Sequence, residues 1–109
     1  MSWDFGMKID AGGVGLVDLQ YGAYYTYNVS PMYYDAFETE DGIRVLDGLS
    51  GLECQRILEN AIQNFKNKKE EYKKMNPENG WGNYEGALEL LHKLLVWCIE
   101  APNAIMIIS

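Results

Sequence analysis

The sequence predicts an α+β fold: a small mixed β-sheet, built from N-terminal strands and a C-terminal strand, with two main helices packed on one face and a short third helix. Residues 2–30 alternate between apolar and polar side chains, which is typical of strands. Residues 50–65 and 83–98 instead repeat their apolar side chains with the period of a helix. Strands followed by helices favour an α+β arrangement, and a chain of 109 residues forms a single domain, 1–109.

The N-terminal part of the chain predicts the strands. Ser2–Asp10 alternates without interruption, and Ala11–Gly13 predicts a tight turn because glycine accepts the positive φ that a hairpin needs. Val14–Ser30 keeps the same alternation. We expect it to break near Gln20–Gly22 into two strands, because strands usually run about five or six residues; one long strand is the alternative. The residues expected on the inner face are Trp3, Phe5, Met7, Ile9, Val17, Leu19, Tyr21, Ala23, Tyr25, Tyr27 and Val29.

Capping residues mark the first two helices. Ser30 and Pro31 predict the start of a short helix that reaches about Phe37, since a serine hydroxyl caps a helix and proline suits its first position. Ser50 and Glu53 form a capping box, S-x-x-E, which predicts the start of a long helix.

The remaining segments are less regular. Residues 66–74 are polar nearly all round, and we expect them to extend the long helix as a solvated end. Ile43–Gly48 is expected to be a short extended piece or a connection. Asn83 predicts the N-cap of the last helix, and Pro102 predicts its end. Ala104–Ile108 is wholly apolar, which predicts a strand that is buried on both faces or central in the sheet.

The net charge of −7 is unevenly distributed. Residues 1–65 carry ten acidic and three basic side chains, whereas residues 66–74 carry five lysines and two glutamates. An acidic body disfavours direct binding to nucleic acid or to an anionic membrane, because binding phosphates requires cations. It favours a basic protein partner, although solubility alone also explains it. No membrane span or signal peptide is recognisable, so we expect a cytoplasmic protein.

Trp81 lies in a turn-forming stretch, NPENGWGN, at residues 76–83. We favour the interpretation that this stretch is a tight connection between two helices, with the indole folded onto the helix pair as a lid that closes the core. The alternative interpretation leaves Trp81 and Tyr84 exposed on a rigid loop, as anchors for a partner.

The run YYTYNVSPMYY, residues 24–34, is a second candidate site. Its alternation sends Tyr24 and Asn28 outward, and Tyr33 and Tyr34 fall on the short helix that follows. These four residues form a candidate polar and aromatic surface that would suit protein recognition or stacking on a nucleobase. Ordinary sheet surface is the alternative.

Three carboxylates in four residues, Glu38, Glu40 and Asp41, form a third candidate for partner binding. They lack the ligand spacing of a calcium or magnesium loop, so we predict a solvated turn and no metal site. The lysines of residues 66–74 alternate with glutamates, which favours a self-paired helix surface over a phosphate site.

The sequence contains no recognisable catalytic constellation, and we predict no enzymatic activity and no cofactor. His92 is the only histidine and lies on the polar side of the last helix. Cys54 and Cys98 lie on apolar helix faces, where we expect buried free thiols. The common phosphate-binding, dinucleotide-binding, nucleophile-elbow and zinc-protease motifs do not occur.

Five stretches carry a resemblance to a known group of proteins and together cover most of the chain: MSWDF (1–5), YTYNVSPMYYDAF (25–37), GIRVLDGLSG (42–51), NPENGWGNYEGALELL (76–91) and IMIIS (105–109). With them the chain resembles a family of small proteins encoded in phage and prophage genomes. The family has no assigned activity and supplies no catalytic residues. The resemblance implies a context in which small acidic proteins bind a host protein, and in which inhibitors of CRISPR nucleases present carboxylates to a surface meant for nucleic acid.

Three functional hypotheses follow. The favoured one is a non-enzymatic, phage-derived binding protein that antagonises a host factor through an acidic surface, as an anti-CRISPR or other anti-defence inhibitor does. The second is a small-molecule or nucleotide-binding module, with Tyr24, Tyr33, Tyr34 and Trp81 forming a stacking pocket. The third is a phage structural or replication accessory protein. In addition, an exposed sheet edge would allow two copies to pair as a homodimer.

Overall fold

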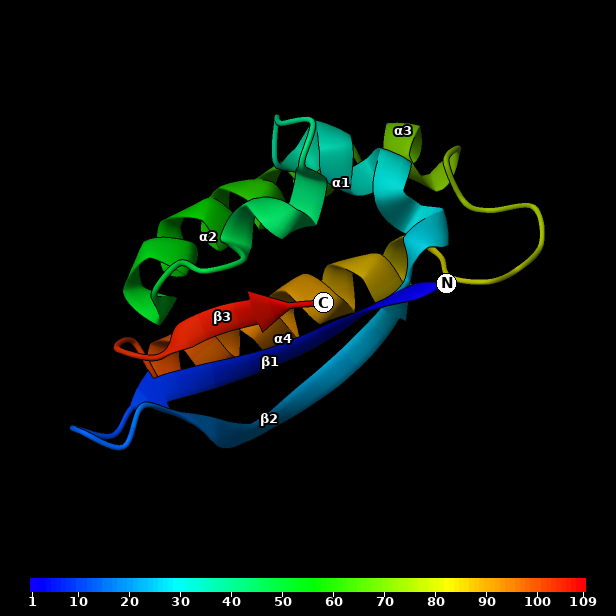
Figure 1. Cartoon of the computed structure of the whole chain (residues 1–109). Coiled ribbons are helices and arrows are strands. Elements are labelled where there is room, and N and C mark those ends of the chain that lie inside the picture. Colours follow the sequence, from blue (N-terminus) through cyan, green and yellow to red (C-terminus); the bar gives the residue numbers. More distant parts are fainter.

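A computed structural model describes all residues, 1–109, and confirms the α+β fold (Figure 1). It contains three strands, two 3-10 helices and four α-helices. In chain order the elements are β1 (Ser2–Asp10), β2 (Leu16–Thr26), the 3-10 helix η1 (Tyr27–Val29), α1 (Ser30–Ala36), the 3-10 helix η2 (Gly42–Leu46), α2 (Gly51–Asn67), α3 (Lys69–Lys73), α4 (Tyr84–Glu100) and β3 (Ile105–Ile108). None of the helices is both long and apolar enough to cross a bilayer.

The sheet has the strand order β2-β1-β3 and is antiparallel throughout, not mixed as expected. β3 lies at an edge, so its predicted central position is wrong. Its side chains alternate between buried Met106 and Ile108 and half-buried Ile105 and Ile107. The strand needs no polar alternation because its second face is only partly exposed, and this is why the sequence pattern misled.

β2 is one continuous strand of 11 residues, so the expected break near Gln20–Gly22 is wrong. The pairing register nevertheless shifts at this place. Gly6 pairs with Gly22, whereas Lys8 pairs with Asp18, so that Met7 alone lies opposite residues 19–21. The irregularity that the sequence suggested is therefore a β-bulge, which bends a strand without ending it.

Both long helices pack on one face of the sheet, and the other face is bare. Figure 1 shows α4 running behind the strands. The buried inner face of β1 presents Trp3, Phe5 and Met7, as its alternation predicts. On the bare face, Asp4 of β1 and Tyr24 of β2 lie opposite each other and are exposed.

An aromatic cluster closes the core at the end where α2 finishes and α4 begins. The hydroxyl of Tyr84 donates to the carbonyl oxygen of Phe65 at 2.7 Å, and the hydroxyl of Tyr33 donates to that of Ala87 at 2.8 Å. Each buried ring thus keeps a partner for its polar atom, as burial requires. The Phe65 ring packs on Tyr33, Tyr72 and Tyr84 with centroid separations of 4.8–5.9 Å.

The capping box of α2 is confirmed. Most of residues 66–74 are exposed and helical, as expected, but they do not continue α2 as one helix. The Ser50 hydroxyl accepts from the Glu53 N–H at 3.1 Å, and the Glu53 carboxylate accepts from the Ser50 N–H at 3.0 Å. At its other end α2 stops at Asn67, and α3 begins at Lys69. This break in the helix lets the Tyr72 side chain point into the aromatic cluster, where it is fully buried. The Tyr72 hydroxyl donates to the Asp35 carboxylate, and this bond lowers the pKa of Asp35.

The outer edge of β3 is covered by the segment between η2 and α2, residues 47–50. Gly48 N–H donates to Met106 O at 2.8 Å, and Met106 N–H donates to Leu49 O at 2.9 Å. The Asp47 carboxylate accepts from the N–H of Ile108 at 2.8 Å. The segment 43–48 is thus helical in its first part, as η2, and only its end runs beside the sheet.

Candidate protein-binding surface

The loop that carries Trp81 is held by asparagine side chains. Asn79 Oδ1 accepts from the Trp81 N–H at 2.9 Å, and Asn76 Oδ1 accepts from the Tyr84 N–H at 2.8 Å. Asn83 is the N-cap of α4, as predicted, and its Oδ1 accepts from the Gly86 N–H at 2.7 Å. These bonds fix the backbone on both sides of the indole, so Trp81 stands on an ordered support.

The Trp81 indole is exposed, with 69% of its surface accessible to solvent. The expected lid over the helix pair is therefore wrong. The neighbouring Tyr84 closes the core in its place, because it begins α4 and points into the aromatic cluster. The alternative interpretation, with both residues exposed, holds for Trp81 and fails for Tyr84.

Trp81 borders an open hollow of about 550 Å³ beside the end of β2. Tyr24, which is 76% exposed, and Asn28 line the same hollow. The residues that complete its wall are Met1, Ser2, Tyr25, Thr26, Asn79 and Gly82. The structure thus brings three of the predicted site residues, distant in sequence, to one place. We call Tyr24, Asn28 and Trp81 the aromatic rim.

The two tyrosines of α1 do not join the aromatic rim. Tyr33 is fully buried, and burial raises its pKa well above the ordinary value, so it belongs to the core and not to a surface. Tyr34 is half exposed but lies in a different, smaller hollow of about 260 Å³, together with Asp41 and Arg44. The stacking pocket expected from four aromatic residues is therefore not formed.

The acidic residues Glu38, Glu40 and Asp41 lie exposed on the turn between α1 and η2. Glu38 has a φ of 57°, which marks the end of the α1 segment as a tight turn. The chain contains no group of three or more histidine, cysteine, aspartate or glutamate side chains arranged to hold a metal ion. This turn is separate from the hollow at the aromatic rim, and Asp41 lines the hollow that holds Tyr34.

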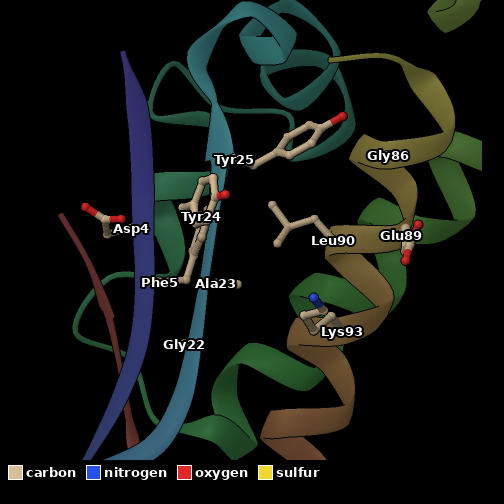
Figure 2. Close-up of a pocket in the computed structure, with 10 residues that line it drawn as sticks. All are labelled: Asp4, Phe5, Gly22, Ala23, Tyr24, Tyr25, Gly86, Glu89, Leu90 and Lys93. Atoms are coloured by element: carbon tan, nitrogen blue, oxygen red, sulfur yellow. The ribbon is translucent and has the colours of Figure 1, made fainter. Parts of the chain in front are cut away.

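A larger hollow of about 750 Å³ lies next to the aromatic rim, between the edge of β2 and α4 (Figure 2). Small residues are part of its lining: Gly22 and Ala23 on the strand, and Gly86 on the helix, where the Tyr25 side chain packs against the glycine. Figure 2 shows Leu90 pointing from α4 toward the strand, with Glu89 and Lys93 also on the helix. Tyr24 and Asp4 bound it on the bare face of the sheet. We call this hollow the β2–α4 groove.

Both ends of the β2–α4 groove are tied by tyrosines of β2. The Tyr25 hydroxyl accepts from the Asn83 N–H at 3.2 Å, and the Tyr21 hydroxyl donates to Glu100 at 3.2 Å. Desolvation raises the pKa of Tyr21, and the neighbouring Glu100 carboxylate raises it further. These two bonds join β2 to α4 and to its N-cap on either side of the hollow.

His92 and the two cysteines lie in different parts of the molecule. His92 lies in an open hollow of its own, with Lys66 and Lys69 from the neighbouring segment and Glu85 and Glu89 from α4. Cys54 and Cys98 are free and buried, as predicted. A hydrogen bond with Cys98, together with burial, raises the pKa of the Cys54 thiol, which keeps it protonated and unreactive.

The β2–α4 groove was missed by reasoning from the sequence. Glu89 and Lys93 read as an ordinary polar helix surface, and Gly22 and Ala23 as ordinary strand positions. A signal was present in the strand itself: between Leu16 and Thr26 the only charged residue is Asp18. Comparisons with family models, curated proteins and solved structures give no match to this chain.

Proposed function

We propose that this chain is a non-catalytic binding protein that contacts a protein partner through the aromatic rim, Tyr24, Asn28 and Trp81. The observation that carries the proposal is the exposed indole of Trp81 on a loop fixed by asparagine side chains. A tryptophan in water gains free energy when a partner covers it, and a fixed backbone lowers the entropic cost of binding. Tryptophan and tyrosine are also enriched among the residues that dominate binding energy.

The finer part of the proposal concerns the partner. The net charge of −7 supports a basic partner, such as a host protein that binds nucleic acid. The resemblance to phage and prophage proteins supports an antagonist of host defence, with CRISPR nucleases among the candidate targets. Such a complex forms faster at low ionic strength, because salt screens the attraction between the two surfaces.

Affinity capture tests the contact surface. The wild-type chain and a Trp81→Ala variant are each used to capture proteins from a bacterial lysate at low and physiological salt. The Trp81→Ala change is expected to weaken capture about 30-fold, since a central anchor contributes about 2 kcal/mol. Tyr34→Ala is the matched control, because Tyr34 is also an exposed aromatic residue but lies in another hollow. Equal loss in both variants, or none in Trp81→Ala, contradicts the assignment of the aromatic rim.

Nuclease assays test the finer part separately. The purified chain in excess is added to several CRISPR nucleases, and cleavage of a matched DNA target is followed. Inhibition that weakens with added salt supports the inhibitor proposal. Undiminished cleavage in every system removes this target class and leaves the protein-binding proposal to the capture experiment.

A second candidate function rests on the size of the hollow at the aromatic rim. Two exposed rings, Tyr24 and Trp81, border about 550 Å³, which falls in the range of small-molecule sites. Stacking on aromatic rings tolerates any nucleobase. A thermal-shift screen with nucleotides and cyclic dinucleotides tests this function, and the absence of any shift at millimolar concentration counts against it.

A further inference from the structure

We propose that β2 is the pairing surface of a homodimer, in which two copies place their β2 strands antiparallel about a twofold axis at Ala23 and form one continuous sheet. The inference concerns the β2–α4 groove and goes beyond the proposed function; the two contact surfaces share only the rim residue Tyr24. It rests on three features: unpaired backbone groups, a strand without protective charges, and two sets of residues that complement themselves across such an axis.

The backbone of β2 has a free side. Asp4 and Ser109 exchange both of their backbone hydrogen bonds at 2.9 Å, so the polar groups of Asp4 point toward the β3 side. Because these directions alternate along a strand, Phe5 points toward β2 and bonds with its partner, Ala23. Gly22 and Tyr24 consequently direct their N–H and C=O groups away from the sheet. No hydrogen bond from a loop or side chain reaches the backbone groups of these two residues.

Nothing in the sequence of β2 protects this edge. Natural sheets shield free edges with lysine, proline, short strands or a covering segment. β2 has 11 residues and contains neither lysine nor proline, and its one charged residue is Asp18. The bulge at residues 19–21 bends one part of the strand and leaves Gly22–Thr26 in regular register with β1. An edge of this kind is expected to be paired in the working protein.

The strand complements itself when the twofold axis passes at Ala23. Gly22 of each copy then lies opposite Tyr24 of the partner subunit, and each such pair exchanges both of its backbone hydrogen bonds. The exposed ring of Tyr24 covers the glycine of the partner, an arrangement that stabilises edge glycines in sheets. Ala23 meets its own copy, and its small side chain allows the close approach.

The charges on α4 complement themselves about the same axis. Gly86 lies against Tyr25, and the ring of Trp97 packs on that of Tyr21 with centroids 5.3 Å apart. α4 therefore runs antiparallel beside β2, and the level of Ala23 falls midway along this part of the helix, between Glu89 and Lys93 (Figure 2).

A twofold axis at that level places Glu89 of each copy opposite Lys93 of the partner subunit. Both residues line the β2–α4 groove, and the ion pairs within the chain lie elsewhere, so both charges are available. The groove presents one acidic and one basic side chain, so it does not favour an unrelated strand of either net charge. A second copy supplies the opposite charge at both positions, and this favours self-pairing over another occupant.

Charge reversal tests the dimer. The mass in solution is measured by sedimentation across a concentration series for the wild type, Glu89→Lys, Lys93→Glu and the double variant. The wild type is expected at twice the chain mass of 12.4 kDa. Each single reversal sets like charges against each other at both symmetric contacts and weakens dimerisation about tenfold. The double variant restores the dimer, and so does an equimolar mixture of the two single variants.

Matched controls separate the contact from net charge and from folding. Glu59→Lys and Lys74→Glu change the same charges on exposed positions of other segments and are expected to leave the dimer intact. Circular dichroism shows whether each variant is folded. A wild type that stays monomeric throughout overturns the proposal. So does a dimer that ignores both single reversals, or a monomer whose Gly22 and Tyr24 amides become protected from exchange only when a different protein is added.

Discussion

At the β3 edge of the sheet, residues 47–50 donate and accept backbone hydrogen bonds and a carboxylate meets the last amide, whereas at the β2 edge the outward groups of Gly22 and Tyr24 have no partner in the chain. The shorter strand, β3, is the protected one. The longer strand lies beside a hollow of about 750 Å³. The difference indicates that a connecting segment covers the β3 edge, whereas the β2 edge stays available for contact with another chain.

The largest expected effect comes from a substitution that disturbs the protected edge. A Cβ atom on Gly51 would lie 2.5 Å from the carbonyl oxygen of Ala101 and 3.0 Å from Cα of Pro102, both backbone atoms. Gly51→Ala must therefore separate α2 from the end of α4, and we expect a loss of about 3 kcal/mol in the free energy of unfolding. Urea denaturation measures it. Gly22→Ala on the open edge meets nothing within 4 Å and should change stability by less than about 0.5 kcal/mol.

A smaller effect is expected from the carboxylate that ends the protected edge. Asp47→Ala removes the acceptor of the buried Ile108 N–H and should cost about 1–2 kcal/mol. Amide exchange at Ile108, followed by NMR, should accelerate in step with this loss. Asp47→Asn keeps an oxygen acceptor and is expected to retain most of the protection. Equal exchange rates in the two variants would show that the hydrogen bond does not protect this edge.

The open edge has its own connection to α4, through the hydroxyl of Tyr25. Tyr25→Phe removes the acceptor of the Asn83 N–H and should lower stability by about 1 kcal/mol. Tyr24→Phe removes a hydroxyl with no partner in the chain, and we expect no measurable change. Thermal unfolding of the two variants side by side distinguishes them, and a larger loss in Tyr24→Phe would contradict the assignment.

The smallest effect is expected near the tip of the hairpin. Leu16 begins β2 and is about half exposed, so Leu16→Lys should alter the free energy of unfolding by less than about 0.5 kcal/mol. Solubility should rise, because a lysine on a free edge discourages edge-to-edge association. A loss above about 1 kcal/mol would mean that this side chain is covered, and that the edge is less open than its exposure indicates.

Local patterns predicted much of the fold. The alternation of residues 2–10 gave the buried face of β1, and the capping residues Ser50, Glu53 and Asn83 marked where α2 and α4 begin. These signals act between neighbours in sequence, so they need no knowledge of the rest of the molecule. The order of the strands depends on contacts between distant parts of the chain, so local patterns do not determine it. β3 was predicted to be central because an edge strand covered by a loop is as apolar as a central one.

The candidate site was less predictable because tertiary packing decides which aromatic side chains are buried. Tyr33 and Tyr34 are adjacent, yet one is fully buried and the other 51% exposed, since the core lies on only one side of α1. Trp81 and Tyr84 differ in exposure for a similar reason. Tyr84 belongs to the first turn of α4 and follows its direction, whereas Trp81 lies in the loop before it. Composition alone does not show toward which side of the chain an aromatic side chain points.

The hairpin of β1 and β2 extends past the helices at its turn (Figure 1). Between Lys8 and Asn28 no residue is buried, so this length of chain gives the core no fully enclosed side chain. Its tip can therefore fray while the remainder stays folded. A protease is expected to nick the chain first at the glycines of residues 11–15, and the cut protein should still melt as one cooperative unit.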